Sequence, residues 1–105
     1  MLQVLVTNLV LKMSLFVKSD IMETIKDDIL KKFGEHIRRL RVESGLSQDD
    51  IVLNSYKITK ATISDIENGK RNLSFTTLID LAKGMKRHPT ELLNYDREII
   101  EDTKE

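Results

Sequence analysis

Large apolar residues recur at intervals of three or four positions through the middle of the chain. They are Ile25, Ile29, Phe33, Ile37 and Leu40. This spacing places them along one face of a helix, with charged residues on the other faces. Gly45 follows, and a glycine can take the left-handed backbone conformation that ends a helix. The pattern therefore predicts an amphipathic helix that ends near Ser44.

A short helix is predicted directly after this turn. The Ser47 hydroxyl can accept a hydrogen bond from the first turn of the helix, and the Asp50 carboxylate can accept one from the Ser47 backbone N–H. Such a capping box begins a helix at Ser47, and the helix runs to about Asn54. The polar stretch 54–57 then forms the connection to the next apolar residue, Ile58.

A third helix is predicted to begin at Thr59, whose hydroxyl makes it a favourable capping residue. Ile63 and Ile66 lie about one turn apart and form its buried side. Asn68-Gly69 ends it. The residues that face outward are Lys60, Ala61, Thr62 and Asp65.

Two more helices complete the predicted core. Ser74 caps the fourth, which carries an apolar stripe of helical period. This stripe consists of Phe75, Leu78, Ile79, Ala82 and Met85. The fifth begins at His88-Pro89, because a proline at the first helical position needs no backbone donor, and Leu92 and Leu93 close the core. The fold class is therefore all-α, with a five-helix domain.

The apolar run Leu2–Val17 admits more than one structure. Its partial alternation of apolar and polar positions fits a hairpin, or a strand that pairs with a partner chain, and a helix is the competing interpretation. A third reading is that Met22 is the natural start and that residues 1–21 are extra translated sequence. The run is shorter than the roughly 20 apolar residues of a membrane-spanning helix and contains Lys12, so no membrane anchor is expected. No positive charge precedes it, so no export signal is expected either.

The chain thus divides into three zones. Residues 1–21 form the apolar extension, residues 22–95 the helical domain, and residues 96–105 a charged tail whose only large apolar residues are Ile99 and Ile100. A length of 105 residues with 40% hydrophobic content suffices for one modest core. The formal net charge is zero, which is unusual for a nucleic-acid-binding protein. However, residues 74–105 hold five basic and seven acidic residues, so acidic charge is displaced away from the third helix.

The residue types argue against catalysis. Cysteine is absent, which excludes disulfides, thiolate metal sites and cysteine nucleophiles and fits a reducing cytoplasm. The two histidines, His36 and His88, have no metal-ligand spacing, and the chain has no glycine-rich phosphate loop. We therefore expect no enzyme activity, no metal and no cofactor.

Several motifs in a fixed order carry a resemblance to a known family. They are RVESGLSQ at 41–48, TISDIENGK at 62–70, LIDLAK at 78–83 and ELL at 91–93. With these motifs, the stretch from Phe33 to Leu93 resembles the DNA-binding domain of the phage-repressor and Cro-like regulators, often called the Xre-like family. The resemblance implies a repressor-like helix-turn-helix domain that reads operator DNA through the helix beginning at Thr59.

The resemblance also implies roles for individual residues. Base edges would be read by Lys60, Ala61, Thr62 and Asp65. Contacts to the DNA backbone, or support of the recognition helix, would come from Gln48, Thr59, Asn68, Lys70 and Arg71. Arg41 and Glu67 would meet as a structural ion pair between the first helix and the end of the recognition helix.

The chain departs from the family pattern at four places. The connection Leu53–Ile58 is one residue longer, and Leu73 replaces a common proline. Arg87 stands where the family usually buries an aliphatic residue. Asp65 occupies a base-facing position where a basic or amide side chain is more usual, although a carboxylate there can accept from a cytosine amino group.

The predicted function is sequence-specific transcriptional regulation, as a cytoplasmic repressor that binds double-stranded DNA as a homodimer. Two copies are expected because one small helical domain covers too little DNA surface for the affinity typical of operators. Candidate dimer surfaces are the run Leu2–Val17, the segment Leu92–Tyr95 and Ile99-Ile100. The alternative function is a protein-interaction module or antitoxin component that uses the same fold to bind a protein partner. A restriction-modification controller fits the short chain equally well.

Overall fold

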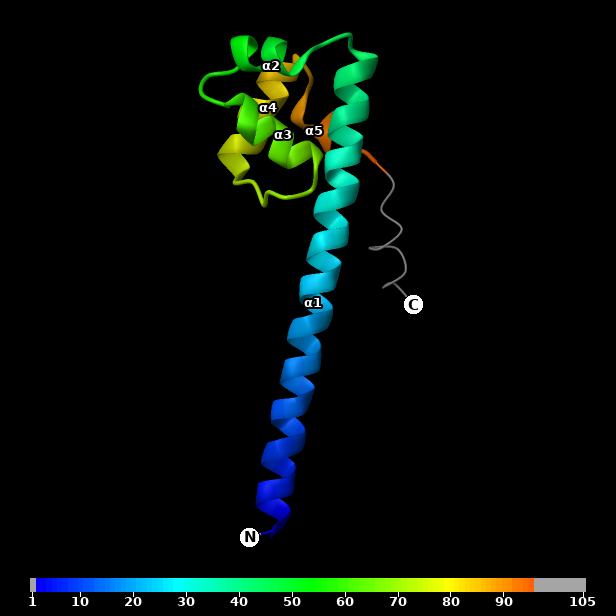
Figure 1. The fold of residues 1–105 in the computed structure, drawn as a ribbon, viewed down its shortest axis with the longest axis vertical. Helices are drawn as coiled ribbons and strands as arrows, with labels where there is room; N and C mark the ends of the chain where they lie inside the picture. Colours follow the sequence, from blue (N-terminus) through cyan, green and yellow to red (C-terminus); the bar gives the residue numbers. More distant parts are fainter. Residues whose placement is uncertain (1, 96–105) are drawn as a thin grey trace.

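The computed structural model describes residues 2–95 of the chain. This part contains five α-helices and no strand: α1 (Leu2–Glu43), α2 (Gln48–Asn54), α3 (Lys60–Glu67), α4 (Phe75–Met85) and α5 (Pro89–Leu92), as Figure 1 shows. The prediction of an all-α, five-helix domain is therefore confirmed.

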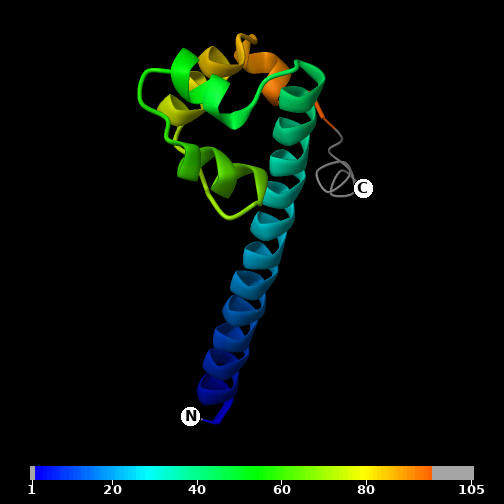
Figure 2. The same ribbon diagram turned by 45° about the horizontal axis from the view of Figure 1, so that its top comes forward.

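Helix α1 is far longer than the other four and projects beyond them. Its C-terminal part packs against the short helices, while its N-terminal part extends away from the domain (Figures 1 and 2). No glycine or proline occurs before Gly34, so nothing in the sequence interrupts the helical hydrogen bonds. No helix within residues 2–95 is long and apolar enough to cross a membrane.

The helical interpretation of the run Leu2–Val17 is therefore correct, and the hairpin and strand interpretations are wrong for this structure. A helix satisfies its backbone groups within the segment, whereas a strand requires a partner and a hairpin requires a turn, and the run has neither glycine nor proline to form one. The expected boundary after residue 21 falls inside this continuous helix. The expected tail at 96–105, with Ile99 and Ile100, lies outside the described residues.

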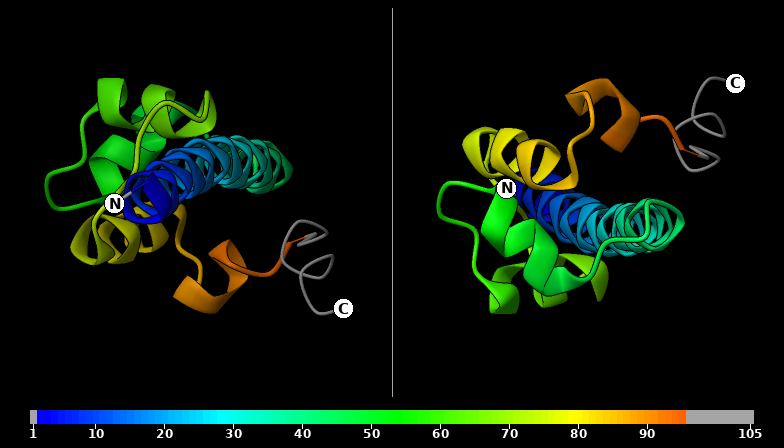
Figure 3. Two further views of the ribbon diagram at one scale, coloured as in Figure 1. Left: turned by 90° about the horizontal axis from the view of Figure 1, so that it is seen from below. Right: turned by 90° about the horizontal axis from the view of Figure 1, so that it is seen from above.

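The core forms where the four short helices gather around the C-terminal part of α1 (Figure 3). Helices α3 and α5 pack on different sides of α1, and α2 packs against α3 and α4. The buried apolar side chains are Phe33, Ile37, Ile51, Ile58, Ile63, Ile66, Leu81, Ala82, Met85 and Leu92. One contiguous core of this size agrees with the expectation for a short chain.

Three predicted core residues lie on the surface. Phe75 is 75% exposed, Ile79 is 40% exposed and Leu93 is 46% exposed. Helix α4 instead buries Leu81 together with Ala82 and Met85 in its C-terminal half. Phe75 is the first residue of the helix and precedes this buried part, and Ile79 lies about 60° around the helix from Ala82. Leu93 is the residue that ends α5 and follows the buried Leu92.

The predicted helix starts agree with the structure. Ser47, Thr59, Ser74 and His88 each occupy the position before a helix and accept a hydrogen bond from its first turn. Ser47 forms the predicted capping box with Asp50, with distances of 2.8 and 3.0 Å. These caps fix the four short helices by local hydrogen bonds, which is why the sequence alone could place them.

Candidate nucleic-acid interface

Helices α2 and α3, joined by the turn at 55–59, form a helix-turn-helix unit. Ile63 and Ile66 anchor α3 in the core, as predicted. On the opposite side Lys60 and Ala61 are exposed. Thr62 and Asp65 are half-buried, so they border this surface. The structure thus brings the four predicted base-reading residues to one helix, with Lys60 and Ala61 exposed.

The first turn of α3 is closed by threonine hydroxyls. Thr59 Oγ1 accepts from the Thr62 backbone N–H at 3.1 Å, and the two hydroxyl oxygens lie 2.9 Å apart. Thr59 therefore acts as the helix cap, and the Thr62 hydroxyl already has a partner within the protein. Either hydroxyl still has the capacity for one further hydrogen bond.

The Lys60 side chain extends from α3 toward α2. Its Nζ is 3.4 Å from a carboxylate oxygen of Asp49, near the start of α2. Both side chains are more than half exposed, so solvent and salt weaken this ion pair. The Lys60 ammonium remains accessible from outside.

A buried ion pair joins α1 to the end of α3. The Arg41 guanidinium donates twice to Glu67, with 2.8 Å from Nε to Oε2 and 2.9 Å from Nη2 to Oε1. Arg41 also donates to the Leu46 carbonyl at 3.1 Å. The Glu67 side chain is only 5% exposed. The hydrogen bonds to Glu67 raise the pKa of Arg41, which strengthens the charged form of the pair.

Gln48 contacts the same carboxylate. Its side-chain amide lies 3.4 Å from Glu67 Oε1, and the residue is half-buried in the first turn of α2. Glu67 thus accepts from residues of α1 and α2 while it belongs to α3. This arrangement holds Gln48 against the end of α3.

Basic residues follow the end of α3. Asn68 ends the helix and its side-chain amide lies 3.4 Å from Ser64 Oγ. Gly69 takes a φ of +71°, and the turn brings Lys70 and Arg71 to the surface, where both are exposed. The Lys70 N–H donates to the Asp65 carbonyl at 2.9 Å, which fixes the backbone of this turn.

Gly34 sets the distance between α1 and α3. A Cβ atom at this position would overlap the Ile66 carbonyl oxygen and would lie 2.8 Å from the Glu67 carbonyl oxygen. Only glycine allows the two backbones to approach so closely. No sequence pattern indicates this role, since an isolated glycine inside a predicted helix indicates only lower helix stability.

Asp80 is a second residue that the sequence did not single out as functional. Its carboxylate accepts from the backbone N–H groups of Tyr56, Lys57 and Ile58 at 2.7, 3.0 and 3.2 Å. Burial acts to raise the pKa of Asp80, but these three donors outweigh burial and the pKa is lowered. One side chain from α4 therefore fixes the connection that leads into α3.

Asp80→Asn is expected to lower the free energy of unfolding by about 2 kcal/mol, because the amide cannot accept from all three N–H groups. Since the folded pKa lies below the unfolded value near 3.9, the carboxylate stabilises the protein fully above about pH 5, and this contribution falls as the pH drops through the folded pKa. Urea unfolding of both proteins between pH 7 and pH 3 measures this. The exposed Asp49→Asn serves as control. A difference between wild type and Asp80→Asn that stays constant down to pH 3 would contradict the assignment.

Arg87, the unusual residue at an aliphatic position, has polar partners. Its guanidinium donates to Ser44 Oγ at 2.8 and 3.2 Å and lies 3.6 Å from Glu91. It therefore links the end of α1 to the segment that contains α5. The long side chain reaches the surface from a half-buried position, which explains how a charge is tolerated there.

The histidines have structural partners. His36 Nε2 lies 2.9 Å from the Glu91 carbonyl oxygen, and the ring stacks on Tyr95 with centroids 5.0 Å apart. His88 caps α5. Within residues 2–95 no group of three or more histidine, aspartate or glutamate side chains could hold a metal ion.

Comparison with known proteins assigns the family. The helix-turn-helix family model matches residues 37–92, more than half of the chain. The chain belongs to this helix-turn-helix family, which confirms the resemblance found in the sequence.

Two proteins with similar sequences are a transcriptional regulator and a control protein. An HTH-type transcriptional regulator of Sinorhizobium fredii, y4dJ, is 33% identical over 66 residues, which cover 63% of this chain and 84% of the relative. The control protein C.BamHI of Bacillus amyloliquefaciens is 31% identical over 64 residues, which cover 60% of this chain and 78% of the relative.

Solved structures of restriction-modification controller proteins share the fold. C.AhdI of Aeromonas hydrophila superposes with a TM-score of 0.58 at 34% identity, over 62% of this chain and 97% of that protein. C.Esp1396I, solved as a tetramer with its natural 35-base-pair operator, gives a TM-score of 0.56 at 26% identity, over 72% of this chain and 95% of that protein. Both relatives are thus matched almost completely, while more than a quarter of this chain has no counterpart in them.

Proposed function

We propose that the protein is a sequence-specific DNA-binding regulator of transcription that inserts α3 into the major groove of operator DNA. The observation that carries the proposal is the helix-turn-helix unit itself. Helix α3 is anchored by its apolar side, presents Lys60 and Ala61 to solvent, and is followed at once by exposed Lys70 and Arg71. A helix fits the major groove, and cations at its end meet the adjoining phosphates.

The residues divide into two roles. Lys60, Ala61, Thr62 and Asp65 contact base edges, because they lie on the accessible side of α3. Contacts to the DNA backbone come from Thr59, Asn68, Lys70 and Arg71. Gln48 supports α3 through its contact with Glu67 and lies at the start of α2, where a helix N-terminus suits a phosphate.

Operator binding requires two copies of the chain. One helix-turn-helix module covers about 600 to 1,000 Å² of protein surface on DNA, and the tighter complexes of specific regulators use more. A pair would place two α3 helices in successive major grooves, about 34 Å apart. Membership of the helix-turn-helix family supports a role in operator binding.

Within this class, the restriction-modification controller is the specific role that we propose. Three of the relatives described above are control or controller proteins, and one of them is a tetramer on its operator. Such a protein acts through DNA binding without catalysis. Because its proposed target is operator DNA, we expect the protein to act in the cytoplasm.

The test separates phosphate contacts from base contacts. Selection from random duplexes is expected to give a motif with two half-sites about one helical turn apart. Lys70→Ala and Arg71→Ala should each weaken binding to the selected motif and to random duplexes alike. Each should also lower the slope of log K against log salt concentration by about one. Lys60→Ala should lose about 1 to 3 kcal/mol on the selected site only.

Asp65→Asn provides the second part of the test and should change the preferred base, because an amide both donates and accepts. Titrations at two salt concentrations, with a scrambled duplex as reference, measure the changes in affinity, and a repeated selection with Asp65→Asn measures the preferred base. If Lys60→Ala weakens every duplex equally and Asp65→Asn leaves the motif unchanged, α3 is not the helix that reads DNA.

A further inference from the structure

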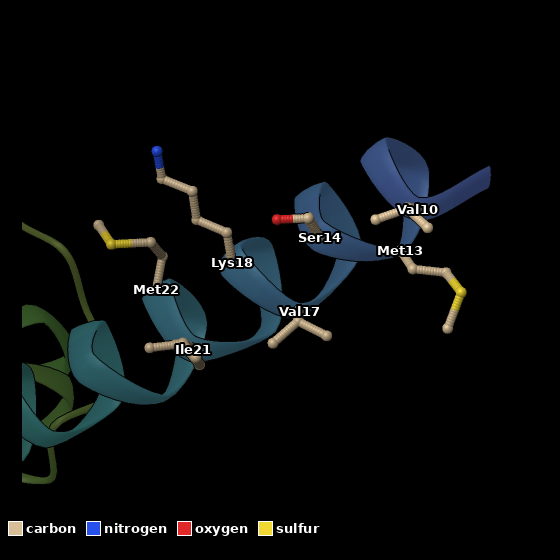
Figure 4. A pocket seen from close by; sticks show the side chains of 7 residues that line it. All are labelled: Val10, Met13, Ser14, Val17, Lys18, Ile21 and Met22. Atoms are coloured by element: carbon tan, nitrogen blue, oxygen red, sulfur yellow. The ribbon is translucent and has the colours of Figure 1, made fainter. Parts of the chain in front are cut away.

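The N-terminal part of α1 exposes a continuous apolar stripe that the helix-turn-helix role does not use. At 100° per residue, one face of this helix carries Leu2, Val6, Leu9, Val10, Met13, Phe16 and Val17. Each of them is more than half exposed. A smaller exposed apolar line, Val4, Leu11 and Leu15, lies on the opposite side. Figure 4 shows Met13, Val17 and Ile21 on one side of the helix and Lys18 and Met22 on the other.

We propose that this stripe pairs with the same stripe of a second copy of the chain, with the two α1 helices antiparallel. A stripe of this size is larger than soluble proteins usually leave in water. At roughly 30 Å² for each methylene-sized group and the observed exposure, it holds about 540 Å² per copy. Full coverage of both stripes buries about 1,100 Å², which is close to the boundary of about 1,200 Å² between transient and stable protein interfaces.

A lipid bilayer is a poorer occupant of the stripe. The helical rise of 1.5 Å per residue makes the segment from Leu2 to Val17 about 24 Å long, whereas a bilayer core is about 30 Å thick. Lys12 also lies within the segment. A second copy covers the apolar face and leaves Lys12 in water.

Charge selects the antiparallel orientation. Asp20 continues the line of the stripe on the side toward the domain, so a parallel pair would set Asp20 against the same residue of its partner. In an antiparallel pair centred between Leu9 and Val10, the two Asp20 side chains instead lie at opposite ends of the interface, so they do not repel each other.

The antiparallel pair places the two helix-turn-helix domains at opposite ends of the joined helices. It is therefore a different contact from the one that sets two α3 helices in neighbouring grooves. The antiparallel contact connects two separate DNA-binding domains and does not place two copies on the half-sites of one operator. The inference does not depend on the proposed function, since it rests on α1 alone.

Two leucines of α1 form a matched pair for the test. Leu9 lies in the stripe and Leu11 lies about 160° away around the helix, with exposures of 59% and 57%. In the full-length protein, Leu9→Glu should halve the mass of the assembly in sedimentation at micromolar concentration. Leu11→Glu should leave the mass unchanged, and both variants should keep the helical circular dichroism of the wild type, which shows that they are folded. Equal masses for the two variants would overturn the proposal.

Cysteine cross-linking tests the orientation, since the chain has no cysteine of its own. Val6 and Met13 lie at equal distances from the proposed centre. A mixture of Val6→Cys and Met13→Cys chains should form a disulfide between the two variants, whereas Val6→Cys alone should not. Efficient cross-linking of Val6→Cys with itself, without the mixed product, would overturn the antiparallel arrangement. DNA binding measured on the same variants reports separately on the proposed function.

Discussion

Glu67→Gln is expected to lower the free energy of unfolding by about 3 kcal/mol, because it leaves the Arg41 guanidinium mostly buried without its counter-charge. Arg41→Met should lower the free energy of unfolding by a similar amount, since the Gln48 amide, 3.4 Å from Glu67 Oε1, is then the remaining hydrogen-bond donor that we identify for this buried carboxylate. Thermal and urea unfolding at one fixed protein concentration measure both, because association alters apparent stability.

The double variant distinguishes a buried pair from two independent effects. Arg41→Met with Glu67→Gln should lose clearly less than the sum of the single losses, because the second change removes the charge that the first left unpaired. The exposed pair of Lys60 and Asp49 is the control, and breaking it should change stability by at most about 1 kcal/mol. Additive losses for Arg41 and Glu67 would show that the two side chains do not act as a pair.

Gly34→Ala is the second change with a large expected effect. The added methyl group meets backbone carbonyl oxygens of Ile66 and Glu67, which cannot rotate away as a side chain does. Helices α1 and α3 must therefore separate, and we expect a loss of about 3 kcal/mol in the free energy of unfolding. Because α3 moves, affinity for the selected operator should fall as well.

Gly45→Ala is the matched control for this prediction. Gly45 has a φ of +72° but no atom within 4 Å of the place that a Cβ would take. The substitution adds only backbone strain, of about 1 kcal/mol. Equal losses for the two variants in urea unfolding would indicate that crowding between α1 and α3 is not what Gly34 relieves.

The sequence predicted those parts of the fold that depend on neighbouring residues. Hydroxyl caps at Ser47, Thr59 and Ser74 and the proline at the start of α5 act within one turn, so their effect can be read locally. The apolar period likewise predicted the buried sides of α1 and α3. The period does not show where along a helix, or how far around it, burial stops, and Phe75, Ile79 and Leu93 were wrongly placed in the core for this reason.

Contacts between distant parts of the chain could not be predicted from pattern. Asp80 is an ordinary surface residue by type, and its role appears only when α4 places it beside the backbone of residues 56–58. Gly34 and Arg87 are similar, since each is explained by a partner from another element. The Leu2–Val17 run was ambiguous because its residues suit both helix and strand, and only the absence of a turn and of a pairing strand favours the helix.

The contact between Lys60 and Asp49 has a consequence for how specificity is measured. In the free protein the Lys60 ammonium already has an acidic neighbour 3.4 Å away, so a guanine would exchange one partner for another rather than meet an unpaired cation. An exposed pair of this kind is worth about 0 to 1 kcal/mol, which is less than a good base contact. The discrimination that Lys60 confers is therefore a difference between two competing partners, and added salt weakens both of them.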